Sequence, residues 1–97
     1  MSSDTHDRKV RQLAKELQQD GWKVKADLRG LDRPAGIGMN NHIPDIVATK
    51  SGATKIIEVD TPRTIDNAQL STFKRSVARR VRARFEHVIT KPRKKKS

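Results

Sequence analysis

Two apolar segments joined by a Ser-Gly turn constrain the fold of this chain more than any other feature. Residues 43–49 and 54–61 are the most hydrophobic stretches of the 97-residue sequence. The intervening KSGA is typical of a β-hairpin turn. Because both apolar runs are nearly continuous, we predict that they form the central strands of a sheet.

The N-terminal third of the chain predicts one helix, one strand and one loop. Apolar residues at helical spacing, after a cap on Asp4 or Thr5, predict a helix over residues 5–20. Apolar and polar residues then alternate over 22–28, the pattern of a half-exposed strand. Residues 29–41 are rich in Gly and Asn and predict a loop, and a loop this long is more often functional than merely connective.

The C-terminal part predicts a second helix and a last strand. Thr64 is a candidate cap, and Leu70, Phe73, Val77 and Val81 follow at helical spacing as a buried stripe. A short strand is expected over residues 85–90. The predicted fold class is therefore α/β, a single small domain with the order α-β-β-β-α-β around a central mixed sheet.

Length and composition restrict the domain organisation and the cellular compartment. We assign residues 1–90 to one domain and 91–97, KPRKKKS, to a disordered basic tail. Only 33% of residues are hydrophobic, so the core is thin. The sequence has no cysteine and no apolar run near the ~20 residues of a membrane span. We therefore expect a cytoplasmic protein with no membrane partner.

The charge balance predicts a polyanionic partner, of which nucleic acid is the usual one. The chain has 22 Lys and Arg against 11 Asp and Glu, a formal net charge of +11. The alternative is that these charges only keep the surface soluble. The candidate nucleic-acid-binding residues lie in the loop, along the C-terminal half of the second helix and in the tail: Arg29, Arg33, Arg75, Arg79, Arg80, Arg82, Arg84, Lys94, Lys95 and Lys96.

Three acids interrupt the two apolar runs. Side chains alternate along a strand, so Glu58 and Asp60 point to one face, while hairpin pairing brings Asp45 near them. Clustered carboxylates in a buried segment are costly unless something compensates. Mg²⁺ or Mn²⁺ would do so, because both prefer oxygen ligands. The alternative is that Asp45 caps a strand and the other two pair with Lys or Arg.

At these residues the chain resembles the PD-(D/E)xK nuclease superfamily, which has the restriction-endonuclease-like fold. Pro44-Asp45 matches the first half of the motif and Glu58 matches the acid of the second half. The predicted element order is similar to the common core of the superfamily. The resemblance implies a Mg²⁺- or Mn²⁺-dependent nuclease in which Asp45, Glu58 and Asp60 hold metal and take part in catalysis.

The sequence departs from the motif at one position, where Asp60 replaces the motif Lys. Some superfamily members carry an acid there, others move the Lys to a helix, and a third group only binds. Lys74 is the candidate for a relocated Lys, and Gln69 and Glu16 resemble helical residues of other branches. For these three, the alternative is an ordinary place on a helix surface. His6 and His87 have no visible partner in the sequence.

The leading hypothesis is thus a metal-dependent DNA nuclease that hydrolyses phosphodiesters. The alternative is a DNA-binding protein on the same fold that has lost activity. A third class, a basic protein that binds RNA, is disfavoured by the small number of aromatic residues available for stacking. Homodimerisation is a further hypothesis, based on the thin core and on the two strands of a DNA duplex.

Overall fold

A helix, three strands, a second helix and a last strand follow one another in the chain, which confirms the predicted order. The computed structural model describes residues 4–39 and 41–90. Its elements are α1 (Asp4–Gln19), β1 (Lys23–Ala26), β2 (Ile46–Lys50), β3 (Ala53–Asp60), α2 (Asn67–Ala78) and β4 (Ala83–Ile89).

The four strands form one mixed sheet in the order β1-β2-β3-β4, so β2 and β3 are central, as predicted. β1, β2 and β3 are antiparallel neighbours, whereas β4 is parallel to β3. The turn between β2 and β3 has φ of 49° at Ser51 and 83° at Gly52. Two successive positive φ values are typical of a type I′ turn, which matches the twist of a hairpin.

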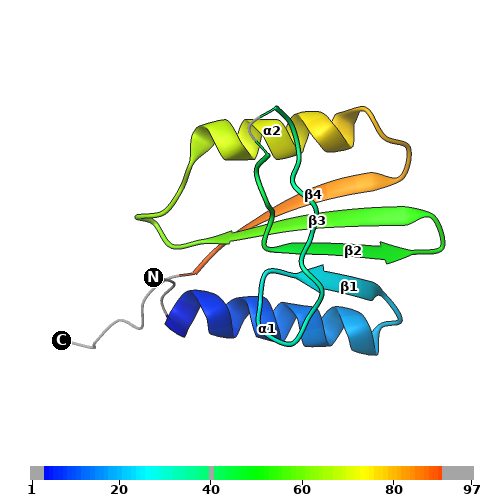
Figure 1. The fold of residues 1–97 in the computed structure, drawn as a ribbon, viewed down its shortest axis with the longest axis vertical. Helices are drawn as coiled ribbons and strands as arrows, with labels where there is room; N and C mark the ends of the chain where they lie inside the picture. Colours follow the sequence, from blue (N-terminus) through cyan, green and yellow to red (C-terminus); the bar gives the residue numbers. More distant parts are fainter. Residues whose placement is uncertain (1–3, 40, 91–97) are drawn as a thin grey trace.

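α1 covers one face of the sheet (Figure 1). Its apolar stripe packs against alternate residues of the strands, so that side chains one residue apart in a strand serve opposite faces. The resulting cluster of buried residues consists of Val10, Ala14, Ala26, Ile46, Ile57 and Val59. This arrangement confirms that Ile57 and Val59 share a face, and alternation therefore assigns Ile56, Glu58 and Asp60 to the other face.

α2 packs on that other face, where it is anchored by Phe73. This side chain is fully buried, and its ring lies 5.8 Å from the ring of Phe85 on β4, centroid to centroid. Leu70 is buried beside it on α2. The chain therefore has a three-layer arrangement in which the carboxylates of β3 face the α2 layer.

The bounds of α2 differ from the prediction. The helix begins at Asn67 because the Asp66 side chain, rather than that of Thr64, accepts hydrogen bonds from the backbone N–H groups of Ala68 and Gln69. It ends at Ala78, because the chain must turn before Ala83 pairs with Thr54 in the sheet. The expected burial of Val81 is therefore wrong, and 88% of this residue is exposed.

The long segment between β1 and β2 runs across the molecule from the α1 side to the α2 side (Figure 1). Within it, Ile37 and His42 form an isolated antiparallel bridge. Gly38 lies against α2 so closely that a Cβ atom there would be 2.7 Å from Thr72 Cγ2. The tip of the segment is thus packed on α2. In the described part of the chain, neither helix is long and apolar enough to cross a membrane.

Candidate active site

Asp45 and Glu58 are linked to each other where β2 begins and β3 approaches its end. Asp45 directly precedes β2, and the pairing of Ile46 with Ile57 sets it beside Glu58. The Asp45 backbone N–H donates to Glu58 Oε1 at 3.2 Å. In return, the Val59 backbone N–H donates to Asp45 Oδ2 at 2.8 Å. The strand pairing therefore positions both carboxylates through the backbone.

Burial makes this pair of acids electrostatically costly. Glu58 is only 7% exposed, and burial, followed by the charge of Asp45, raises its pKa to about 8. Burial also raises the pKa of Asp45, although the N–H of Val59 and the ring of His6 partly offset this effect. At neutral pH, Glu58 is therefore mainly protonated in the absence of a cation.

Asp60 points to the same face of β3 as Glu58 but has partners of its own. Its side chain is buried, and Oδ2 lies 2.8 Å from Nε2 of His87 on β4. The Thr64 hydroxyl donates to Oδ1 at 3.1 Å. The position that holds Lys in the motif is therefore occupied here by an acid that binds an imidazole and a hydroxyl group.

Two histidines near the acids were missed by the sequence analysis, which found no partner for either. His6 on α1 lies with Nε2 3.2 Å from Asp45 Oδ2 and Nδ1 3.1 Å from Asp7 Oδ1. Burial lowers the pKa of His6, but its hydrogen bond with Asp7 and the charge of Asp45 outweigh that effect and raise it. His87 could have been found only from the parallel pairing that sets it beside Glu58.

The donor atoms of the three acids are of the type that a divalent cation prefers, but the present positions of the side chains do not form a complete metal site. Within the described residues, no three His, Cys, Asp or Glu side chains are grouped so that they could hold a metal ion as they stand. The donors are nevertheless carboxylate oxygens, which Mg²⁺ and Mn²⁺ prefer. Burial, which is the first cause of the raised pKa values of Asp45 and Glu58, makes their charged forms costly, and a bound cation would offset that cost.

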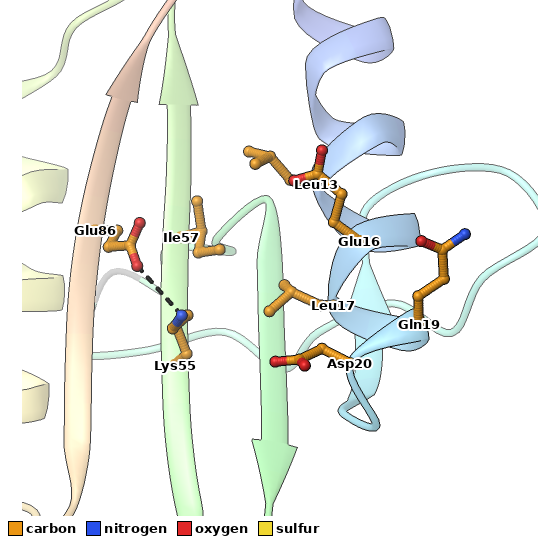
Figure 2. A pocket seen from close by; sticks show the side chains of 8 residues that line it. All are labelled: Leu13, Glu16, Leu17, Gln19, Asp20, Lys55, Ile57 and Glu86. Carbon is orange, nitrogen blue, oxygen red and sulfur yellow. Dashed lines mark ion pairs between the residues drawn. The ribbon is translucent and has the colours of Figure 1, made fainter.

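The helical candidates lie outside this cluster of acids. Gln69 is half-buried in the first turn of α2 and Lys74 is exposed on the same helix. Among the described residues, neither side chain forms a hydrogen bond or ion pair with the three acids. Glu16 lines a pocket with Ile57 and Glu86, on the α1 face of the sheet (Figure 2). This is the face opposite to that of Glu58.

Arg75 and Arg79 line a pocket on the same side of the sheet as the acids. It has a volume of about 720 Å³ and lies between α2 and the tip of the long segment. Ser71 and His42 also line it, and His42 Nε2 is buried without a hydrogen-bond partner in the described part of the chain. Two guanidinium groups beside a hydroxyl group are suited to a phosphate.

The other candidate cations are spread over the molecule. Arg79 caps the C-terminus of α2, Arg80 and Arg82 follow the helix, and Arg84 lies on β4, so the predicted helical stripe is wrong beyond Arg75. Arg29 is exposed, and Arg33 forms an ion pair with Asp27 at 3.3 Å. The three tail lysines, Lys94, Lys95 and Lys96, lie outside the described residues.

Comparison with known proteins identifies the fold. No protein-family model and no curated protein matches the sequence. Among solved structures, the chain matches that of Archaeoglobus fulgidus Hjc, a Holliday junction resolvase from an archaeal hyperthermophile. The TM-score is 0.51 at 26% identity, and the match covers 91% of this chain and 69% of the resolvase chain. The chain thus has an Hjc-like fold, which belongs to the PD-(D/E)xK restriction-endonuclease-like class.

Proposed function

We propose that this protein is a DNA nuclease of the PD-(D/E)xK type that hydrolyses phosphodiesters with Mg²⁺ or Mn²⁺. The observation that carries the proposal is the pair of Asp45, half-buried, and Glu58, buried, linked by hydrogen bonds to backbone N–H groups at β2 and β3. A fold without function at this place would gain stability from apolar residues there. The likeness to a Holliday junction resolvase supports DNA as the substrate.

Asp45 and Glu58 would hold the cation, and Asp60 would assist from the same face of β3. When bound, the cation supplies polarisation of the phosphate and a water molecule of lowered pKa. His6 keeps Asp45 in place at 3.2 Å, and the N–H of Val59 fixes the same oxygen atom. Arg75 and Arg79, beside their pocket on α2, would bind the flanking phosphates of the DNA.

A second candidate function is DNA binding without cleavage. The observation that favours it concerns Asp60, which stands at the position of the motif Lys. Both of its carboxylate oxygens already form hydrogen bonds, one with Thr64 and one with His87. A protein of this kind would retain Arg75 and Arg79 as phosphate ligands. Its affinity for DNA would not depend on Mg²⁺.

Cleavage of defined DNA substrates distinguishes these two functions. The substrates are a single strand, a linear duplex and a four-way junction, the last chosen because the matched structure is a junction resolvase. We expect cleavage with Mg²⁺ or Mn²⁺ and none with EDTA. Asp45→Asn and Glu58→Gln should each lower the cleavage rate by about 100-fold or more, while binding measured in EDTA stays within threefold.

Asp32→Asn serves as the matched control, because Asp32 is an exposed acid in the long segment. Its cleavage rate should equal that of the natural sequence. The second function would be established instead if none of the three substrates is cleaved with either cation and the affinity for DNA is the same with and without Mg²⁺. Sedimentation of the protein with and without the junction would show whether a homodimer is the active species.

A further inference from the structure

Trp22 lies in a basic environment at the end of the sheet far from the carboxylates. It is the only tryptophan of the chain and is half-buried just before β1. The Nζ atoms of Lys50 and Lys55 lie 5.8 and 5.3 Å from the centroid of its ring. Both distances are within the range of cation–π contacts. The two phenylalanines, by contrast, pack on each other at the α2 face.

The indole ring borders a pocket of about 410 Å³ whose other charged walls are all cationic. Lys55, Arg82 and Arg84 line it, and none of its described lining residues is acidic. Lys55 and Arg84 are direct partners across β3 and β4, so two cations lie side by side on the α1 face. Like charges in paired positions of a sheet are destabilising, and an anion between them would reverse that effect.

Acids do reach this region from outside the pocket, but they leave the arginines free of ion pairs. Lys55 pairs with Glu86 at 3.4 Å in the adjoining pocket (Figure 2). Lys50 donates to the Asp20 backbone carbonyl at 2.6 Å. Among the described ion pairs, none involves Arg82 or Arg84. Their guanidinium groups therefore have no acidic partner in the described part of the chain, and apart from the one Arg82 nitrogen that donates to the Ser51 carbonyl, their N–H groups can bind a ligand.

The backbone around the pocket is fixed by contacts between two turns. Arg82 has a φ of 62°, and its Nη1 donates to the Ser51 carbonyl at 2.9 Å. The Thr54 N–H in turn donates to the Arg82 carbonyl at 2.9 Å. The turn before β4 is therefore held on the β2–β3 turn. A preorganised wall of this kind lowers the entropy cost of binding.

An accessible aromatic ring beside several cations is suited to single-stranded nucleic acid. The base stacks on the ring while the cations bind the adjacent phosphates. A base pair inside a duplex is already stacked on both sides, so it cannot cover the indole, whereas an unpaired base can. Lys55 precedes Asp60 by about 17 Å along β3 and points to the opposite face. The pocket is therefore distinct from the candidate active site.

We propose that the Trp22 pocket binds an unpaired segment of nucleic acid, with a base on the indole and phosphates on Arg82 and Arg84. The site does not depend on hydrolysis at Asp45 and Glu58. A protein with both sites would bind DNA in which a single-stranded segment adjoins the region to be cut. This deepens the proposed function by naming a class of substrate, yet the pocket can be tested without cleavage.

Tryptophan fluorescence reports on this pocket directly, because the chain has one Trp and no Tyr. The full chain is titrated in EDTA with an oligothymidylate of about a dozen nucleotides, a length that exceeds the expected contact. We expect quenching that saturates and that weakens with salt. A relaxed closed circular duplex at the same nucleotide concentration, which has no terminal base pair, should leave the fluorescence unchanged. Quenching by both DNAs would overturn the proposal. So would the absence of quenching if the anisotropy of a labelled oligonucleotide shows that it binds.

Charge reversals separate the pocket from the overall charge. Arg84→Glu should weaken binding of the oligonucleotide by about tenfold or more. Arg11→Glu, the matched change at an exposed site of α1, should alter it by less than threefold. Equal losses in the two variants would contradict a local site. Circular dichroism and thermal unfolding establish that each variant is folded.

Two further variants complete the test. Trp22→Phe should retain binding in the anisotropy assay and Trp22→Ala should lose about tenfold, since only the ring stacks. Equal binding by both would refute stacking. Glu58→Gln should quench as the natural sequence does, even if cleavage is absent from all proteins. Loss of quenching in that variant would show that the two sites are one, against the proposal.

Discussion

At the scale of the residue, Glu58 contributes a pH-dependent term to the stability of the fold. Its pKa is raised from 4.5 to about 8 in the folded protein, first by burial and then by the charge of Asp45. The folded state therefore holds the proton more tightly than the unfolded chain does. The contribution of Glu58 to stability is therefore greatest below the unfolded pKa, falls as pH rises from about 4.5 to about 8, and changes little above that.

Glu58→Gln should remove this penalty, because the amide stays neutral and its Oε1 can still accept from the Asp45 N–H. We expect the free energy of unfolding at pH 8 to rise by about 2 kcal/mol, with no gain at pH 4. Urea denaturation at several pH values measures it. Asp32→Asn is the control, and an equal or lower stability of Glu58→Gln at pH 8 would contradict the electrostatic account.

His6 offers an independent probe of Asp45. The pKa of its imidazole is raised because the hydrogen bond with Asp7 and the charge of Asp45 exceed the effect of burial. Asp45→Asn should therefore lower the pKa of His6, as followed by NMR of the ring protons. The ring-proton chemical shifts of His42, which packs on Phe73 rather than on an acid, should be the same in both proteins. A constant His6 pKa would show that the two side chains are not in contact in solution.

At the scale of the element, α2 is held on the sheet by a few apolar side chains. Phe73 is fully buried, whereas Val81 projects into solvent beyond the end of the helix. Phe73→Ala should lower the free energy of unfolding by about 3 to 5 kcal/mol. Val81→Ala should change it by less than about 0.5 kcal/mol. Chemical denaturation of both variants measures these changes. A large loss of stability in Val81→Ala would show that Val81 is buried, as expected for a helix that extends to this residue.

The elements could be predicted largely because their signals are local. Alternation and the Ser-Gly turn indicate the hairpin, and periodicity indicates α1. The end of α2 could not be predicted in the same way, since residues 71–82 contain neither Gly nor Pro. Pairing of Ala83 with Thr54 ends the helix instead, and that contact is 29 residues away in sequence.

The part of the candidate site that depends on local spacing in the sequence could be predicted. Alternation along β3 placed Glu58 and Asp60 on one face, and hairpin pairing brought Asp45 to Glu58. The partners that complete the site come from elsewhere in the chain. His6 approaches from α1, and His87 from the parallel strand β4. No spacing in the sequence encodes these two contacts.

At the scale of the whole molecule, the net charge of +11 should make binding to DNA strongly dependent on salt. Arg75 and Arg79 are the cations placed beside the α2 pocket. Changing both to Gln should reduce the slope of log K against log salt by about 0.9 for each lost phosphate contact. The double variant Arg11→Gln, Lys15→Gln at exposed positions of α1 is the control. Equal slopes for the two double variants would show that Arg75 and Arg79 do not contact the DNA phosphates specifically.

The two ends of the sheet carry different chemistry. Carboxylates and histidines gather where β3 ends, and an indole with arginines gathers where β3 begins. The domain, which has an Hjc-like fold, therefore has the site of the proposed hydrolysis at one end of the sheet. The site proposed for single-stranded nucleic acid lies at the other end. Both depend on the same central hairpin, because β3 contributes Glu58 to one end and Lys55 to the other.

Paramagnetic broadening by Mn²⁺ reports on whether Asp45 and Glu58 bind a cation. In ¹⁵N-labelled protein at neutral pH, we expect the amide signals of residues 45 and 58–60 to broaden at the lowest Mn²⁺ concentrations. An excess of Mg²⁺ should restore them, and Glu58→Gln should abolish the effect. Unchanged signals at these positions up to millimolar Mn²⁺ would contradict this expectation and leave the protein without a metal-dependent site.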